Sequence, residues 1–346
     1  MRHRSLALFL PLLLAFGSQN TFAQTGQGRR LRVMEWNVEN LFDTIDAPSL
    51  QDDAFTPTGA NGWTSGRYWG KLGRLARTIA NAGELQPVDL VGLCEVENDS
   101  VLRDLTERTY LHRLGYERIC ASTSDVRGIS VALLYNPLRF RPLAGRSIAV
   151  PHEPDERPTR HILHVCGEAV SGDTLDVFVV HFPSRSGGRK STEPYRRRAA
   201  RLVRSLIDSI CAARPAAACL VMGDFNDEYR NAAIRRDLGA QLMGEGDAAP
   251  ADGLIDLAAS SKKGAAEGTY VFRGRWNLLD HILVSASLLN GRARLQTSPA
   301  DCRIYAPPAL RESSPHTAFK PRRAYLGTFY QGGTSDHFPL LLDLWW

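Results

Sequence analysis

The sequence predicts an α/β fold in a single compact domain. Strand-like apolar segments alternate with amphipathic helical segments in both halves, the pattern of sheets that are covered by helices. No repeat and no Pro/Gly/Ser-rich linker divides the 346 residues. Hydrophobic residues make up 43% of the chain and charged residues 23%, close to globular averages. This composition excludes a disordered chain, a collagen-like fibre and a polytopic membrane protein.

The first 23 residues are typical of a secretory signal. Basic residues open the chain, an apolar run covers Leu6–Phe16, and Thr21-Phe22-Ala23 offers a small-x-small cleavage site. The run is shorter than the ~20 residues of a membrane span, although an uncleaved N-terminal anchor is the alternative. We therefore expect export to the periplasm or the medium, a loose segment at 24–30 and one domain over 31–346. No other segment is apolar enough to span a bilayer.

The first half of the domain contains four parts with clear signals. A strand is expected over Leu31–Trp36, a Pro/Gly/Asp/Thr-rich loop over 46–66, and a helix over Arg67–Ala82, where apolar residues recur at helical spacing. A short strand at Asp89–Cys94 and a helix at about Ser100–Leu114 follow. Further strands are expected near Tyr116–Cys120, Ser130–Tyr135, His161–Cys166 and Leu175–His181.

The second half opens with an amphipathic helix over Glu193–Ala212. Arginines crowd its polar face, and a solvated face is a more common cause of such a run than a nucleic-acid patch. A buried strand over Cys219–Met222 comes next, and later strands are expected at Tyr270–Phe272, Asp280–Val284 and Pro339–Leu344. The arginines of this helix are Arg196, Arg197, Arg198, Arg201 and Arg204.

The six cysteines do not form a recognisable site. Six cysteines allow 15 disulfide connectivities, and the sequence does not choose among them. Cys94, Cys166 and Cys219 lie in or beside apolar runs, where a free buried thiol is the ordinary case. The absence of a CxxC pair or a Cys/His cluster in the sequence argues against a zinc site.

Polar residues that could act in catalysis or bind a metal ion directly follow several of the expected strands. Strand ends are where α/β folds gather their sites, although an Asp there often only caps a turn. Carboxylate and amide oxygens suit a hard cation such as Mg²⁺. A further carboxylate can activate water, and an imidazole can donate a hydrogen bond to a phosphoryl oxygen. The inventory points to metal-assisted hydrolysis of a phosphate ester. The segments are MEWNVEN (34–40), CEVEN (94–98), HFPSR (181–185), GDFND (223–227), LDHI (279–282) and SDHFP (335–339).

In this order the segments resemble the endonuclease/exonuclease/phosphatase superfamily of DNase I-like enzymes. The match runs from Asn37 to His337, nearly the whole expected domain. The resemblance implies a four-layer α/β/β/α sandwich of two mixed sheets. It also implies a Mg²⁺- or Mn²⁺-dependent hydrolase of phosphate esters.

The resemblance further implies a role for each matching residue. Asn37, Glu95 and Asp336 correspond to residues at the metal site, with Glu95 as the principal ligand. Asp224 corresponds to the residue that positions or deprotonates the attacking water, and Asn226 to the one that orients the phosphate. His181 corresponds to a histidine that contacts the phosphate or assists the leaving group. His337 corresponds to the catalytic histidine and Asp280 to the carboxylate that orients it.

Two arginines are expected to contact the substrate, each with a plain alternative. Arg127 precedes a strand where family nucleases often carry an aromatic or another substrate-contacting residue, so this departure leaves recognition of the leaving group open. Arg185 follows His181 and could contact a phosphate, but a surface arginine is equally common. Glu97, Asn98, Asp227 and His281 adjoin motif residues and are expected to have structural roles.

Three functions were weighed on this basis. The first is an exported phosphodiesterase, foremost an endonuclease on DNA or RNA, acting as a monomer. The net charge of +5, about +3 without the leader arginines, agrees with a polyanionic substrate but does not identify one. The second is a phosphatase or phospholipase C-like enzyme acting on inositol phosphates, sphingomyelin or a small phosphate ester. An exposed apolar loop or hairpin would favour it, and the loop Phe55–Trp63 is a weak candidate. The third, a catalytically dead binding module, conflicts with the complete residue set.

Overall fold

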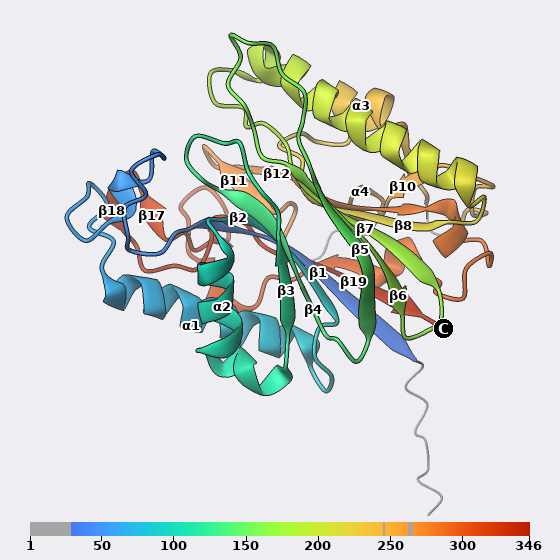
Figure 1. Ribbon diagram of the computed structural model, residues 1–346, viewed down its shortest axis with the longest axis horizontal. Coiled ribbons are helices and arrows are strands. Elements are labelled where there is room, and N and C mark those ends of the chain that lie inside the picture. Colours follow the sequence, from blue (N-terminus) through green and yellow to red (C-terminus); the bar gives the residue numbers. More distant parts are fainter. Residues whose placement is uncertain (1–28, 245, 262–265) are drawn as a thin grey trace, which may run out of the picture.

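The structure, a computed structural model, describes residues 29–244, 246–261 and 266–346. Two mixed sheets pack face to face, with α1 and α2 outside the first and α3 outside the second (Figure 1). This arrangement confirms the expected four-layer sandwich. The expected leader, residues 1–23, lies outside the described residues, as does most of the segment 24–30. No described helix is both long and apolar enough to cross a bilayer.

The first sheet places the earliest and the last strands of the chain side by side. β19 (Leu340–Trp345) pairs antiparallel with β1 (Arg30–Leu41), and β1 pairs parallel with β2 (Leu90–Val96). The remaining strands of this sheet are β14 (Cys302–Ile304), β4 (Ser130–Tyr135) and β3 (Glu117–Cys120), giving the order β14-β19-β1-β2-β4-β3.

The second sheet has seven strands, and its central strands carry His181, Asp224 and Asp280. β7 (Thr174–His181) pairs parallel with β8 (Ala218–Asp224), and β8 pairs antiparallel with β13 (Asp280–Ser285). The other strands are β5 (Phe140–Ile148), β6 (Ile162–Ala169), β10 (Leu254–Asp256) and β9 (Ala240–Gln241), giving the order β5-β6-β7-β8-β13-β10-β9.

Three apolar layers hold the sandwich together. One lies between the sheets and includes Val33, Val177 and Met222; another lies under the helices of the first sheet; the third lies under α3. Burial of such layers is the main stabilising term of a domain of this size. The helices are α1 (Ser65–Gly83), α2 (Asp99–Glu107), α3 (Arg189–Ala213) and the single turn α4 (Leu257–Ser260).

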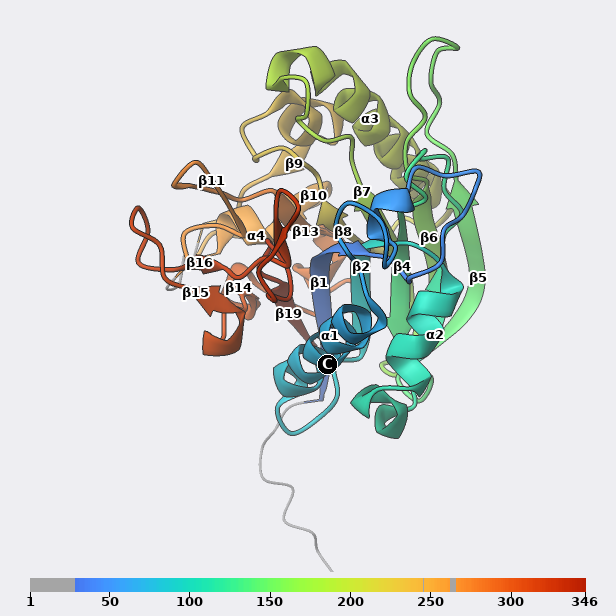
Figure 2. The same ribbon diagram turned by 90° about the vertical axis from the view of Figure 1, so that its left-hand side faces the viewer.

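Three short hairpins stand beside the sheets rather than in them. They are β11 (Tyr270–Phe272) with β12 (Arg275–Asn277), β15 (Arg311–Glu312) with β16 (Lys320–Pro321), and β17 (Tyr325–Leu326) with β18 (Phe329–Tyr330). In Figure 2, β11 and β16 lie on the left and the green loop between β5 and β6 lies on the right.

Three sequence expectations need correction. The helix expected over Ser100–Leu114 ends at Glu107 and resumes as a 3-10 turn over Tyr110–Leu114, after Thr109. β5 was not expected, because an edge strand with mostly exposed residues and a bulge near Pro142 carries no regular apolar pattern. Arg196 does not lie on a solvated helix face: it is fully buried and pairs with Asp227.

Candidate active site

Three candidate residues form one row across the second sheet. Strand pairing places His181 opposite Asp224 and Asp224 opposite Asp280. Each is two positions along its strand from an apolar residue of the layer between the sheets. His181 follows Val179, Asp224 follows Met222, and Asp280 precedes Ile282. Because side chains alternate along a strand, all three point into the gap between the two sheets.

The first sheet contributes Asn37 and Glu95 to the same gap. Asn37 follows Val33 by four residues on β1 and therefore shares its inward face. Strict alternation would turn Glu95 outward, since its neighbour Cys94 faces inward. A bulge between Cys94 and Val96, with Glu95 at a φ of 65°, redirects the side chain.

Backbone strain accumulates around this point. Of the six described non-glycine residues with positive φ, four lie in the motifs: Glu39, Asn40, Glu95 and Asn226. Such conformations cost about 1–3 kcal/mol each and persist where the surrounding structure enforces them, often at functional sites.

Asn37 joins the two sheets through its side-chain amide. Its Nδ2 donates to Asp224 Oδ2 at 3.0 Å and to Glu95 Oε1 at 3.3 Å. On the other side, the Asn226 backbone N–H donates to Asp224 Oδ1 at 2.8 Å, and Asn226 Nδ2 donates to the Phe182 carbonyl at 3.1 Å. Both oxygens of Asp224 are therefore fixed in place.

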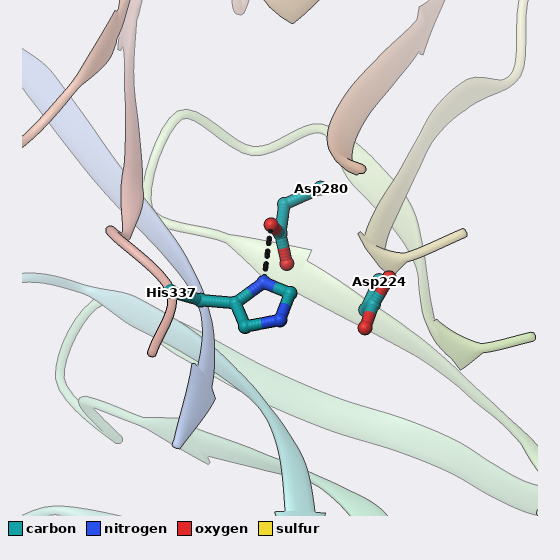
Figure 3. Close-up of side chains that lie close together, drawn as sticks. All are labelled: Asp224, Asp280 and His337. Carbon is teal, nitrogen blue, oxygen red and sulfur yellow. Dashed lines mark hydrogen bonds and ion pairs between the residues drawn. The ribbon is translucent and has the colours of Figure 1, made fainter. Parts of the chain in front are cut away.

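His337 and Asp280 form the closest pair of the site, shown in Figure 3. His337 Nδ1 lies 2.7 Å from Asp280 Oδ2, while His337 Nε2 lies 4.0 Å from Asp336 Oδ1. Burial disfavours the charged ring, but the carboxylates of Asp280, Asp224 and Asp336 outweigh it. They hold the pKa of His337 well above its usual value. This raised pKa favours the imidazolium form, whose Nε2–H can serve a substrate oxygen.

The surroundings of His181, by contrast, favour the neutral ring. Burial and the nearby cations Arg160 and Arg127 lower its pKa well below the usual value. Its Nε2 lies 3.6 Å from Asp224 Oδ2 and 4.0 Å from Glu95 Oε1. The two histidines therefore differ in charge at neutral pH, and two such environments are what acid–base chemistry requires.

Asp224 is poised to take a proton. Burial, followed by the charge of Asp280, raises its pKa to about 7. Glu35, on the same face of β1, is fully buried, and neither of its oxygens has a hydrogen-bond partner among the described residues. Burial and the charges of Asp280 and Asp224 raise the pKa of Glu35 well above its usual value.

The donor set beside Glu95 fits a divalent cation. Burial raises the pKa of Glu39 to about 7, with Asp336 adding to it, and burial raises the pKa of Asp336, with Glu95 adding to it. Buried Lys71 is one cation that these carboxylates share, and burial lowers its own pKa to about 8. Arg323 is a second cation, since its Nη2 lies 3.2 Å from Asp336 Oδ2. The three carboxylates of Glu39, Glu95 and Asp336 outnumber these two cations, which suits a further positive ion of the Mg²⁺ or Mn²⁺ type.

A second group of possible ligands overlaps the row. One ligand atom each from Asp224, Asp280 and His337 lies within 4.8 Å of the others. Because Asp280 already binds His337 through Nδ1, this group agrees better with proton handling than with a primary metal site. Glu95 and Asp336 are the more suitable holders of the cation.

The two candidate arginines have different surroundings. Arg185 donates from Nε to the Asn226 carbonyl at 2.7 Å and from Nη2 to Asn231 Oδ1 at 3.1 Å. These contacts brace the loop that carries Asn226. Arg127 is fixed on Asp125 at 3.2 Å, yet its side chain remains 42% exposed.

The four neighbours with expected structural roles all lie in structural contacts. Glu97 accepts from the Asp43 N–H at 2.6 Å, and Asn98 caps α2 by accepting from the Val101 N–H at 3.0 Å. Asp227 pairs with buried Arg196 at 3.0 Å. His281 Nδ1 lies 2.7 Å from Asp256 Oδ2, and both side chains are fully buried.

Two clefts lie near the candidate residues, one lined by Pro183 and Ser184, which follow His181, and the other lined by Asp336. The His181-side cleft has a volume of about 590 Å³, and the Asp336-side cleft about 410 Å³. The first is lined by Arg127, Arg157, Arg160, Pro183, Ser184 and Tyr195, among others. The second is lined by Tyr270, Phe272, Arg273, Lys320, Arg323 and Asp336, among others. Both carry arginines beside catalytic candidates.

Sequence reasoning did not single out several of these residues. Glu35 and Glu39 stand inside the first motif, but alternation alone does not distinguish a buried carboxylate from an exposed one. Lys71 lies on the apolar face of α1. A lysine in that position of an amphipathic pattern indicates a buried charge and could have been identified from the sequence. Arg160 and Arg323 reach the site only through the tertiary fold.

Comparison with known proteins agrees with this fold. The model of the endonuclease/exonuclease/phosphatase family matches residues 32–345. The chain therefore belongs to this family, whose members are phosphoesterases. A search of curated proteins finds no match.

Solved structures of the family share the fold at low identity. An endonuclease/exonuclease/phosphatase family protein from Bacteroides thetaiotaomicron is 16% identical, with 92% of this chain and 95% of that chain covered and a TM-score of 0.57. A mannosyl-6-phosphatase from the same species is 18% identical, with 91% and 100% covered and a TM-score of 0.56. A humanized TDP2 from D. rerio is 17% identical, with 91% and 98% covered and a TM-score of 0.54.

Proposed function

We propose that the protein is a divalent-metal-dependent phosphodiesterase, with nucleic acid as its substrate and internal cleavage as its mode. The observation that carries the proposal is that one site combines a charged His337, a neutral His181 and Asp224. The carboxylates of Glu95 and Asp336 lie next to them. Asn37, Glu95 and Asp336 would hold Mg²⁺ or Mn²⁺. Such an ion supplies charge neutralisation at a phosphoryl oxygen.

The remaining steps follow from the side chains themselves. Asp224 accepts the proton of the attacking water, because its pKa of about 7 matches neutral conditions. His337 donates its Nε2 hydrogen to an oxygen whose negative charge grows in the transition state, and Asp280 holds the ring for this. Asn226 orients the phosphate. Neutral His181 donates a hydrogen bond on the leaving-group side.

The two clefts support a diester over a monoester. A phosphate monoester extends from phosphorus on one side only, whereas a diester extends on both. One arginine-bearing cleft adjoins the residues after His181, and another is lined by Asp336. The arginines of α3 do not add to this argument: Arg197 and Arg201 pair with Asp237, and Arg198 pairs with Glu156.

Hydrolysis assays test the proposal directly. Purified protein is incubated with plasmid DNA, single-stranded RNA and bis-p-nitrophenyl phosphate, with Mg²⁺ or with EDTA. We expect plasmid nicking that EDTA, Glu95→Ala and His337→Ala each abolish. A Mg²⁺-dependent thermal shift that Glu95→Ala removes would support the metal assignment. Intact nucleic acid together with turnover of another phosphate ester would overturn the nuclease assignment.

The hairpins give a second candidate some support. Phe272, Leu326 and Phe329 are 55%, 58% and 76% exposed, and they lie on hairpins beside the Asp336-side cleft. Exposed apolar tips of this kind suit a lipid surface. Phe55 and Trp63, by contrast, pack with Phe42 and Tyr325 in the interior. Sphingomyelin vesicles and an inositol polyphosphate therefore join the substrate panel, and turnover of either without nicking would favour this candidate.

We also propose that the enzyme acts as a monomer after export. The leader pattern of residues 1–23 supports export. N-terminal sequencing of secreted protein should begin near Gln24, and light scattering should give the monomer mass. Retention of the protein in the cytoplasm would contradict the first expectation.

A further inference from the structure

The His181-side cleft begins where the candidate active site ends. Pro183 and Ser184, the second and third residues after His181, form part of its wall. A cleft of about 590 Å³ lies within the range that holds small ligands. Three prolines, Pro151, Pro158 and Pro183, restrict its walls, so the cavity is largely preformed.

The floor of this cleft is a buried arginine tied to the active site. Arg160 is 5% exposed, and its Nη1 donates to Asp125 Oδ2 at 2.9 Å. Its Nη2 donates at 2.6 Å to the Phe182 carbonyl, the same oxygen that Asn226 binds from the other side. A ligand that rests on this floor is therefore held at a fixed place relative to Asn226.

The floor also has unused polar capacity. Arg160 Nε and Thr159 Oγ1 are buried and have no hydrogen-bond partner among the described residues. Unpaired buried polar groups are uncommon and call for a partner such as water or a ligand. Two such groups on consecutive residues mark this floor as a place for a polar ligand.

Positive side chains outnumber negative ones at the cleft, whose lining includes the four arginines Arg127, Arg157, Arg160 and Arg198 against three carboxylates. Asp125 is bound by Arg127 and Arg160, and Glu156 is bound by Arg198, which leaves exposed Asp155 as the remaining acidic side chain of the lining. Arg127 keeps 42% of its side chain exposed. Arg157 is exposed and forms no ion pair with any described residue. Two guanidinium groups thus face the cleft, and guanidinium groups bind phosphate oxygens well.

We propose that the His181-side cleft is a subsite for a second phosphate of the substrate, bound by Arg127 and Arg157 above the Arg160 floor. This inference rests on the proposed phosphodiesterase function and narrows its substrate class. The preferred substrate carries a phosphate one residue away from the bond that is cleaved. That phosphate has two possible sources, the next internal phosphodiester of a strand or a terminal phosphate monoester.

Four short substrates separate these sources. They are a thymidine dinucleotide without terminal phosphate, the same dinucleotide with a 5′-phosphate or with a 3′-phosphate, and the thymidine trinucleotide. We expect kcat/KM to be about tenfold higher for one phosphorylated form than for the plain dinucleotide, as one charge-assisted contact provides. Preference for the trinucleotide identifies an internal phosphate, and preference for a dinucleotide form identifies a terminal one. Equal kcat/KM for all four would overturn the proposal.

Arg157→Ala is the informative variant, because an exposed side chain can be truncated without loss of folding. It should reduce the ratio of kcat/KM values between the preferred substrate and the plain dinucleotide at least about fivefold. Arg77→Ala, an exposed arginine on α1, is the matched control and should leave this ratio unchanged. An equal loss on all four substrates in Arg157→Ala would contradict the subsite.

Failure of the proposed function itself would be recognised separately. If wild-type protein with Mg²⁺ cleaves neither the dinucleotides nor bis-p-nitrophenyl phosphate, the phosphodiesterase assignment fails. The cleft is then judged by calorimetry of the metal-free protein with inorganic pyrophosphate. Binding that Arg157→Ala weakens at least about fivefold, and Arg77→Ala does not, would support an anion site. Equal binding by both variants, or none by wild type, would overturn it.

Discussion

At the scale of single residues, Asp280 makes the shortest contact among the carboxylates that keep the His337 ring charged. Asp280 Oδ2 lies 2.7 Å from His337 Nδ1, and Asp280 is fully buried, so water does not compete for the contact. Its other oxygen, Oδ1, is buried without a partner among the described residues. The carboxylate therefore acts chiefly through the ring that it orients.

Asp280→Asn should keep the shape of the site and lose the charge that stabilises the imidazolium. We expect kcat to fall by about 10²–10⁴-fold, as for other oriented histidines. The double variant Asp280→Asn/His337→Ala should be no slower than His337→Ala alone, because both changes disable the same Asp280–His337 pair. Steady-state kinetics with thermal unfolding as the folding control checks this. Additive losses would show that Asp280 acts independently of His337.

A second residue-scale prediction concerns Gly223, which precedes Asp224. Its φ is 147°, and a Cβ placed there would lie 1.8 Å from the Val180 carbonyl oxygen. Gly223→Ala should lower the free energy of unfolding by about 3 kcal/mol or more, since the backbone of β7 or β8 must shift. Gly145→Ala is the matched control, because its Cβ would meet no atom within 4 Å. Similar denaturant midpoints for both variants would contradict this account.

At the scale of elements, α3 braces the active-site loop through a buried ion pair. Arg196 Nε lies 3.0 Å from Asp227 Oδ2, and both side chains are almost fully buried. Arg196→Met leaves Asp227 without this partner in the interior, so we expect a loss of about 3–5 kcal/mol of unfolding free energy. Arg204→Ala removes an exposed pair with Asp208 and should cost under about 0.5 kcal/mol. Urea unfolding of the two variants measures the difference.

The first and last strands are joined by a charge cluster that responds to pH. Arg32 on β1 donates to Asp343 on β19 at 2.6 and 2.8 Å. Burial alone would raise the pKa of Asp343, but Arg32 and Arg303 outweigh it, and the pKa is lowered. The stabilisation is therefore complete above the unfolded value of about 3.9 and is lost as the pH falls through the folded pKa.

Asp343→Asn tests this link. We expect the variant to be less stable than wild type at pH 7, by about 3 kcal/mol, because Arg32 loses its buried carboxylate and keeps only the exposed Glu84 as an ion-pair partner. The difference should shrink as the pH falls below about 4, where wild type loses the same charge. Unfolding curves recorded from pH 7 to pH 3 provide the measurement, and a difference that stays constant with pH would exclude the assignment.

The character of each helix and strand determines whether it could be predicted from the sequence. Long strands with apolar cores, such as β1 and β8, and the amphipathic helix α1 were predicted within a few residues, because hydrophobic periodicity determines them. β5 was missed because an exposed edge strand has no such periodicity. Glu95 was found through its motif, although alternation alone points it outward; the bulge that redirects it is a tertiary effect. Burial of Arg196 depends on Asp227, a residue on another element.

At the scale of the whole molecule, the site lies in the gap between two sheets and near two arginine-bearing clefts. A polyanion that spans both clefts would displace counterions from several phosphates, whereas a small diester would not. We expect kcat/KM for an oligonucleotide to fall at least several-fold between 50 and 200 mM salt. Turnover of bis-p-nitrophenyl phosphate should change little over this range. Equal salt dependence of the two substrates would contradict a substrate that occupies both clefts.

The position of β19 in the first sheet has a consequence for how the protein is made. β19 pairs with β1 across a separation of about 310 residues, and His337 lies just before it. Contacts between such distant parts of a chain form late. During synthesis, β1 cannot pair with β19 until the end of the chain has been made. His337 is therefore the last residue of the candidate site to take its place. On the proposed mechanism, a ribosome-bound chain that still lacks His337 would be unable to cleave the messenger RNA that encodes it.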